Sequence, residues 1–467
     1  MLLLSFGALT VAAIVLAAAL VPEARGSERA VVAAVLVPAL SIGLVYGLSA
    51  MDAITPLAWS VSSVLVSASV AFALGPRARS TVLGDAAVLW QTARGVGASS
   101  VLCATAATGA ASVGLATLAA GLLEPWAWDA LGYHLPIVHD ALQSRTLREV
   151  PTSVVYVNAY PRLVDVFFVA WRLGLRDETW VELGQLPFTA VGVSAIAALA
   201  RRAGVEREHA LAGAFLWLAL PIVMLQLATA YIDLAVGALC LATFVLVTAP
   251  LRGRAELVAG LAAGLLLGSK PSAPPLVAVA LATLLLRCAR EQRLGRAVLG
   301  CLLALSIGGW KYLENLREHA NPIWPVELSL GPIRFAGKVG MAELTASNLP
   351  EPYRSMGWLA RLASSWTAQP ERWVFDMRIG GFGPLFTFGL LPAALVIALA
   401  TLRRPTLRAA LRPIVLPIGL VVAATLATPA AYWSRYTLAV PGALLALVLA
   451  GLRELRPRAQ AAVAIAA

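Results

Sequence analysis

The chain has 467 residues, of which 60% are hydrophobic and only 13% charged, and its mean hydropathy is +0.80. An ordinary globular domain carries about 25% charged residues, so this composition excludes a soluble fold. The formal net charge is +11, but most of the excess is arginine in short segments between apolar runs. That distribution is typical of cytoplasmic loops, so we expect no nucleic-acid partner.

The apolar runs are long enough to cross a bilayer, which takes about 20 residues of helix. The fold expected is therefore an all-α polytopic membrane protein with about thirteen transmembrane helices. The predicted spans are residues 2–21, 31–51, 55–75, 100–123, 181–200, 209–228, 233–250, 257–270, 273–287, 298–316, 384–402, 413–429 and 436–452. Because no basic residue precedes the first run and Arg25 and Arg29 follow it, it is expected to be retained, with its N-terminus outside.

Lysine and arginine distinguish the two sides of the membrane. The loops on one side are rich in arginine, whereas the short loops 52–54, 229–232 and 430–435 on the other side hold only Arg435. The positive-inside rule makes the arginine-rich side cytoplasmic. Two long loops, 124–180 and 317–383, then lie outside, and residues 456–467 form a cytoplasmic tail. The apolar segment 163–175 is too short to span, at about 20 Å of helix, and is predicted to be a juxtamembrane helix on the outer face.

The four cysteines lie within apolar runs or at their ends: Cys103, Cys240, Cys288 and Cys301. They have neither metal-ligand nor redox spacing, so they are interpreted as packing residues. Pro271, Pro274 and Pro275 interrupt another apolar stretch directly after Lys270. Two half-length helices are expected to meet there, near the outer surface.

The first outer loop begins with an acidic and aromatic cluster. The first eleven residues after a predicted span include Trp126, Trp128, Asp129, Tyr133 and His134. The aromatic residues alone suit an interfacial belt. A carboxylate among them also suits a sugar or phosphate site, because aromatic faces stack on sugars and a carboxylate accepts a hydroxyl proton. Both interpretations stay open, and His134 and His139 lack a third ligand for a metal.

Further polar residues lie at the outer ends of spans. Asp233 suits either a helix cap or a functional carboxylate, and the two roles are compatible. Lys270 and Lys311 suit either snorkelling to headgroups or binding a phosphate. Arg435, in the one basic short outer loop, departs from the charge rule and is therefore a candidate functional residue.

Taken in order, these motifs resemble the GT-C superfamily of membrane glycosyltransferases, in particular the bacterial branch related to protein O-mannosyltransferases and lipid A aminoarabinose transferases. The matching segments span roughly residues 100–455: Trp128-Asp129-Ala-Leu-Gly-Tyr133-His134-Leu-Pro136, Tyr160-Pro161-Arg162-Leu163, Asp233, Gly264-Leu-Leu-Leu-Gly268-Ser-Lys270, Asn315, Asn321-Pro322-Ile-Trp324-Pro325 and Arg435-Tyr436. Residues 1–99 would be additional N-terminal helices outside this core.

The resemblance implies transfer of a sugar from a polyprenyl-phosphate donor to a lipid, glycan or protein acceptor, at the outer face of a bacterial inner membrane. Asp129 falls on the family's base, Asp233 on its second acidic residue, and Lys270 and Arg435 on its phosphate-binding cations. Trp128, Tyr133, His134 and Asn321 would complete the substrate-binding set. Many members have a paired acidic motif where this chain has Asp129 alone, so no cofactor is expected and use of a divalent metal stays open.

Three other classes of membrane protein are alternatives. A secondary transporter would place ionisable residues near the midplane and show an internal repeat, whereas here they gather at one surface and no repeat is evident. A glycan polymerase or ligase would differ in its outer loop. A non-catalytic scaffold is the third alternative.

Overall fold

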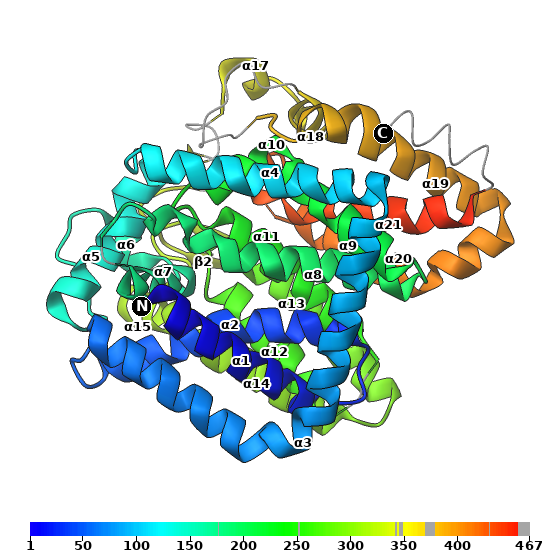
Figure 1. The fold of residues 1–467 in the computed structure, drawn as a ribbon. Helices are drawn as coiled ribbons and strands as arrows, with labels where there is room; N and C mark the ends of the chain where they lie inside the picture. Colours follow the sequence, from blue (N-terminus) through cyan, green and yellow to red (C-terminus); the bar gives the residue numbers. More distant parts are fainter. Residues whose placement is uncertain are drawn as a thin grey trace.

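The computed structural model describes residues 1–175, 177–250, 253–340, 343–344, 349–368, 379–428 and 430–455. These residues are almost entirely helical, as predicted (Figure 1). They also contain one antiparallel hairpin of β1 (Leu328–Leu330) and β2 (Ile333–Phe335), in which Ser329 lies opposite Arg334. The tail expected over 456–467 lies outside the described residues.

The N-terminal quarter forms four helices: α1 (Leu2–Leu20), α2 (Gly26–Ser49), α3 (Pro56–Ala98) and α4 (Ser100–Leu122). Thr55 and Ser99 cap the last two, with side-chain oxygens accepting from Ala58 N and Leu102 N. The prediction that a helix ends near residue 75 was wrong, because α3 has 43 residues and continues past Pro76 to Ala98. Figure 1 shows that α3 changes direction, so that its second half crosses the end of the bundle. This half holds Arg77, Arg79 and Arg94, which the sequence analysis places in a loop between the predicted spans 55–75 and 100–123.

The middle of the chain forms shorter and more broken helices: α8 (Leu186–Arg202), α9 (Arg207–Phe215), α10 (Pro221–Leu227), α11 (Asp233–Thr248), α12 (Ala255–Leu267), α13 (Pro274–Arg290), α14 (Leu294–Gly308) and α15 (Trp310–His319). Short 3-10 turns, Val181–Gln185 and Leu216–Ala219, precede α8 and follow α9. The segment 207–219 meets α10 at 77°, and α14 meets α15 at 61°. The predicted break at Pro271 to Pro275 is present between α12 and α13.

The C-terminal part contains α19 (Leu391–Arg403), α20 (Pro405–Leu426) and α21 (Ala439–Glu454), with a π-helical segment Leu385–Leu390 before α19. Among the described residues, seven helices are long and apolar enough to cross a membrane, or up to nine if each bent pair counts as one span. The chain is therefore a multi-pass membrane protein. The expected count of thirteen is not reached. Helices α11 and α12, among others, are too short to be counted as membrane-spanning helices.

The two segments expected to be outer loops carry short elements. The first contains a π-helical turn (Ala130–His134), α5 (Leu135–Ser144), α6 (Val155–Ala159) and α7 (Leu163–Gly174). The second contains β1, β2, α17 (Glu351–Arg354) and α18 (Trp358–Thr367). Helix α7 coincides with the predicted juxtamembrane helix, but all its residues except Arg172 are buried.

One apolar core runs through the molecule and includes residues of α1 and α2 together with those of α7, α8, α11 and α12. Every residue of α11 except Thr248 is buried. Helices that are apolar on all sides pack inside such a core, whereas α4 keeps apolar side chains exposed at Val101, Leu115, Leu118 and Leu122. Helices α1, α2, α8 and α11 run roughly along one common direction in Figure 1. That arrangement brings helix ends, and the polar residues at them, together.

The arginine distribution predicts which end of the bundle is outside. In a variant without native cysteines, Ser153→Cys and Ala336→Cys, both at exposed positions, should react with a membrane-impermeant thiol reagent added to intact cells. Glu206→Cys, whose native side chain is 74% exposed at the other end, should react only after the membrane is opened. Ala130 and Ala203 are unsuitable probes because both are buried. Labelling of Glu206→Cys alone in intact cells would reverse the orientation.

Candidate active site

Four charged side chains from distant parts of the sequence meet in one cluster. Asp129 precedes the π-helical turn, Asp233 begins α11, Lys270 lies between α12 and α13, and Arg435 lies in the 3-10 turn Ser434–Tyr436 before α21. Arg435 Nη1 is 2.8 Å from Asp129 Oδ2 and 3.6 Å from Asp233 Oδ2. Lys270 Nζ donates to Asp233 Oδ1. The charges thus alternate as Asp129, Arg435, Asp233 and Lys270, which we call the charge cluster.

The charge cluster is largely withdrawn from solvent. The Arg435 and Asp233 side chains are each 3% exposed, and that of Asp129 is 16% exposed. A buried charge is tolerated when it is paired and hydrogen-bonded. The charges of the two carboxylates and the two cations neutralise one another here, and Asp129 is the more accessible of the two carboxylates.

Aromatic rings lie within cation–π distance of both cations. Lys270 Nζ lies 3.6 Å from the centroid of the Tyr436 ring. The Arg435 guanidinium carbon lies 5.0 Å from the Tyr231 centroid, 5.2 Å from that of Tyr436 and 5.8 Å from that of Trp433. Cations within about 6 Å of a ring centroid are attracted by the ring quadrupole. These contacts fix the direction in which each cation points.

Tyr231 and Gln185 fix the backbone positions of Asp129 and Asp233. The Asp129 backbone N–H donates to the Tyr231 hydroxyl at 3.1 Å. Gln185 Nε2 donates to the Tyr231 carbonyl, and Gln185 Oε1 accepts from Ala235 N at 3.1 Å. One fully buried amide therefore joins the residues on both sides of Asp233. Sequence analysis gave neither residue a role, and the signal that could have found Gln185 is an amide at the beginning of an apolar span.

Lys270 is positioned by its backbone as well as by Asp233. The Tyr312 hydroxyl, on α15, lies 3.1 Å from both the Leu267 and Lys270 carbonyls. Leu163 N donates to the Gly268 carbonyl at 2.8 Å, which attaches the start of α7 to the same turn. A side chain at Gly268 would collide with Leu163, since an added Cβ would lie 2.4 Å from Leu163 Cδ1. The Gly-Ser-Lys sequence thus allows close packing directly before Lys270.

Half-buried tyrosines lie beside the more accessible edge of the cluster. Tyr133 and Tyr160 have ring centroids 6.3 Å apart in an edge-to-face arrangement, and Tyr156 lies 5.0 Å from Tyr160. Burial, and then the charge of Asp129, hold the pKa of Tyr133 well above its ordinary value. Burial also raises the pKa of Tyr160. The phenols remain protonated hydrogen-bond donors at neutral pH.

His134 lies behind this surface. Its side chain is 3% exposed, and its Nδ1 is 2.6 Å from Asp165 Oδ1 of α7. The contact ties the π-helical turn that follows Asp129 to the most buried helix of the outer segment. The arrangement favours a supporting role over the expected direct contact with substrate. Sequence analysis did not single out Asp165, which lies within an apolar run.

Two other residues expected to bind substrate lie in different environments. Asn321 is 0% exposed, and its amide is used by its own loop, donating to the Val326 and Ala336 carbonyls and accepting from Ile323 N. Trp128 is 77% exposed and lies on the surface next to Asp129. Asn321 therefore organises the second outer segment, whereas Trp128 is free to meet lipid or substrate.

The charge cluster also sets the ionisation of Asp129. Burial by itself would raise the pKa of this carboxyl, but the charge and hydrogen bond of Arg435, together with His134 and Lys270, hold the pKa below its usual value. Asp129 is therefore ionised at neutral pH. While Arg435 stays in contact, the carboxylate is a weaker base than a free aspartate.

The described residues contain no group of three or more His, Cys, Asp or Glu side chains placed to hold a metal ion. His139 pairs with Glu178 at 2.7 Å, on the surface, whereas His134 pairs with Asp165. The two histidines that sequence spacing had put close together thus have different partners. Comparison of the chain with protein-family models, curated proteins and solved structures gives no match.

The Lys270–Asp233 pair should be strongly coupled. Lys270→Met leaves Asp233 with only the longer Arg435 contact, and removal of one partner from a buried pair costs about 3–5 kcal/mol. Asp233→Leu should be destabilising for the same reason, whereas the double variant Lys270→Met/Asp233→Leu should recover much of the loss. Thermal or denaturant unfolding in detergent measures all three. Additive losses in the double variant would contradict the pairing.

Proposed function

We propose that this protein transfers a sugar from a polyprenyl-phosphate donor to an acceptor hydroxyl at the outer surface of the membrane, and that the charge cluster is its active site. The observation that carries the proposal is the convergence of Asp129, Asp233, Lys270 and Arg435 from four distant segments. A phosphate needs cations and an acceptor hydroxyl needs a carboxylate, and the cluster provides both.

The reaction would require little covalent chemistry from the protein. The acceptor oxygen attacks the anomeric carbon as the bond between that carbon and the phosphate oxygen breaks, and the electron pair stays on the phosphate. Attack opposite the phosphate inverts the anomeric centre. Asp129 takes the hydroxyl proton as general base, while Arg435 and Lys270 stabilise the charge left on the lipid phosphate.

Arg435 has a double role in this mechanism. It contacts Asp129, yet a donor phosphate would compete for the same guanidinium, because Arg binds phosphates and carboxylates through the same N–H groups. Donor binding would therefore loosen the Asp129–Arg435 contact and make Asp129 a stronger base. The tyrosines Tyr133, Tyr156 and Tyr160 supply ring faces and phenol donors of the kind that bind a sugar.

Secondary transport is the main alternative, since broken helices and buried ionisable residues also occur in transporters. Two features favour transfer. The four charged residues lie at or beyond helix ends, with Asp233 the first residue of α11 and Lys270 after α12. They also adjoin the first outer segment, where an extracytoplasmic acceptor would arrive.

Asp129→Asn tests the proposed base. The amide keeps the size of the carboxylate but cannot accept the proton, so transfer should fall by about 100- to 10,000-fold. Donor binding should persist, because Arg435 and Lys270 remain. Turnover and binding of a labelled polyprenyl-phosphate sugar are measured on the same purified protein.

The matched control for this variant is Asp140→Asn, which changes a carboxylate of the same outer segment that pairs with the exposed Arg148. It should leave turnover close to that of the wild type. Near-normal turnover in Asp129→Asn would remove Asp129 from catalysis and leave Asp233 as the carboxylate to test.

The pH dependence of kcat/KM tests the link between Arg435 and Asp129. Arg435→Gln removes the charge and hydrogen bond that lower the Asp129 pKa, while burial continues to raise it. The acid limb of the profile, which reports the free enzyme, should therefore move to higher pH. Arg435→Lys keeps the charge and should move the limb less. Donor affinity should also fall by about 10- to 150-fold in Arg435→Gln. An unmoved acid limb in both variants would contradict this link.

A further inference from the structure

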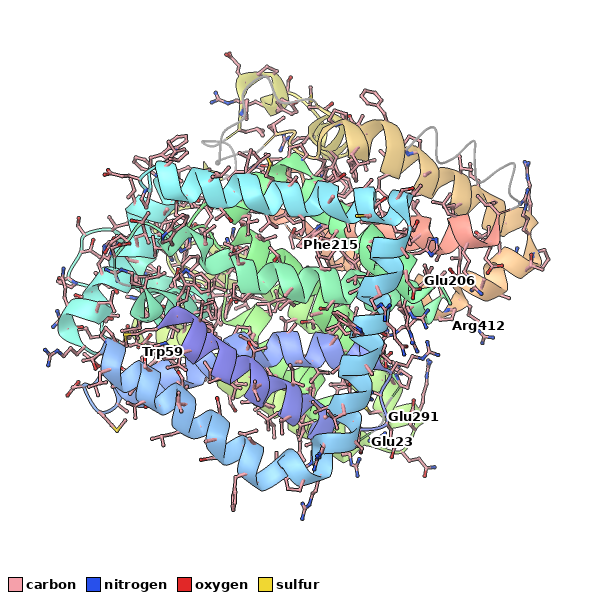
Figure 2. All side chains as sticks on the ribbon, in the orientation of Figure 1. Glu23, Trp59, Glu206, Phe215, Glu291 and Arg412 are labelled. Carbon is pink, nitrogen blue, oxygen red and sulfur yellow. The ribbon has the colours of Figure 1, made fainter. Side chains whose placement is uncertain are left out.

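Helix α18 of the second outer segment packs against the residues that precede Arg435. Figure 1 shows α17 and α18 together on one side of the bundle. They lie away from the arginine-rich end, at which Figure 2 labels Glu206 and Arg412. The second outer segment and residues 430–436 form a small apolar cluster, separate from the main core, which includes Leu349, Tyr353, Leu362, Tyr432, Trp433 and Tyr436. The second outer segment is therefore packed directly against a part of the charge cluster.

Two side chains of α18 bind the backbone of residues 431–434. Trp366 Nε1 donates to the Ala431 carbonyl at 3.1 Å. Ser365 Oγ donates to the Tyr432 carbonyl and lies 3.5 Å from Ser434 Oγ. Ser365 is 0% exposed, and among the described residues neither carbonyl has a second hydrogen-bond partner. Because a buried carbonyl without a partner is costly, the two contacts fix the backbone that leads into the 3-10 turn of the charge cluster.

Helix α18 is itself held in place from two sides. The Trp366 ring lies 6.0 Å, edge to face, from the ring of Phe382, which belongs to the main core. The Arg361 guanidinium carbon lies 5.1 Å from the centroid of the Tyr432 ring, within the range of a cation–π contact. The helix therefore connects the main core to the segment that precedes Arg435.

The contacts of Arg435 depend on where its backbone lies. Its Nη1 is 2.8 Å from Asp129 Oδ2 and 3.6 Å from Asp233 Oδ2. The turn Ser434–Tyr436 that carries it has only three residues, so a shift of the preceding backbone moves the guanidinium with it. Charge-assisted hydrogen bonds require donor and acceptor at about 2.7–2.9 Å, and a small displacement is enough to weaken them.

We propose that Ser365 and Trp366 are positioning residues, which set the backbone from which Arg435 reaches Asp129 and the donor phosphate. The second outer segment then completes the active site without contacting the reacting atoms. The inference deepens the proposed sugar transfer and rests on it for its kinetic consequences. The coupling between α18 and Asp129 is a property of the fold and is measured without any substrate.

Hydrogen–deuterium exchange of the full-length protein in detergent measures this coupling. Ser365→Ala leaves the Tyr432 carbonyl without its partner, so amides of residues 430–437 should exchange faster. Because Arg435 is paired with Asp129, residues 127–134 should also exchange faster. Trp366→Phe, which keeps a ring but removes the N–H donor, should act in the same direction. Faster exchange confined to 358–368 and 430–434 in both variants would overturn the positioning role.

The matched control is Ser364→Ala, which removes a hydroxyl from the neighbouring position of α18. This half-buried side chain has no hydrogen bond within the part of the chain that the structure describes. Its variant should exchange as the wild type does at residues 127–134 and 430–437. Equal effects of Ser364→Ala and Ser365→Ala would mean a general loosening of α18 and would overturn the assignment of Ser365.

The pH dependence of kcat/KM separates positioning from a merely structural role. Arg435, His134, Lys270 and the phenol of Tyr133 face Asp129, and Ser365→Ala displaces the first of them. Since Arg435 lowers the pKa of Asp129, the acid limb should move to higher pH, as in Arg435→Gln, and donor affinity should fall by about three- to tenfold.

A lower kcat with an unmoved acid limb in Ser365→Ala would show a structural effect alone and would overturn the positioning role. The failure of the proposed function has a different signature, which is a wild-type protein that transfers no sugar from any polyprenyl-phosphate donor. In that case hydrogen exchange at residues 127–134 still decides the inference, because it needs no substrate.

Discussion

The structure around the charge cluster depends on Arg435 lying between Asp129 and Asp233. A buried guanidinium and buried carboxylates each lose hydration that only close opposite charge replaces. The segment before α21, the segment after α4 and the start of α11 must therefore meet at one point. Lys270 extends the arrangement by compensating the second charge of Asp233. Tyr231, Gln185 and Tyr312 then fix the backbones from which these side chains project.

The same compensation limits the basicity of Asp129. Asp129 is ionised but held by Arg435, so it combines the correct charge state with reduced basicity. A ligand that brings its own negative charge to Arg435 changes that balance. In the proposed reaction, Asp129 becomes an effective base when a donor phosphate binds Arg435. Helices α7 and α11, buried along nearly their whole length, give the cluster a rigid support.

The two ends of the bundle differ in their chemistry. In the charge cluster, the two cations are buried and lie against aromatic rings. At the other end, arginines are numerous and mostly exposed. The first arrangement suits a reacting phosphate that must be held in one geometry.

Sequence alone determined that this is a multi-pass helical membrane protein, because run length and hydropathy are local properties that the bilayer selects directly. It also pointed to Asp129, Asp233, Lys270 and Arg435, since ionisable residues at the ends of apolar runs are conspicuous. Their pairing was decided only in three dimensions: Asp129 and Arg435 are 306 residues apart, and no local pattern encodes such a contact. For the same reason, the sequence did not reveal the contacts of Gln185 and Asp165. It also did not reveal that the Asn321 amide forms its hydrogen bonds within its own loop. The continuation of α3 past Pro76, whose second half is tied to α2 by the ion pair of Asp85 with Arg29, likewise involves residues far apart in the sequence.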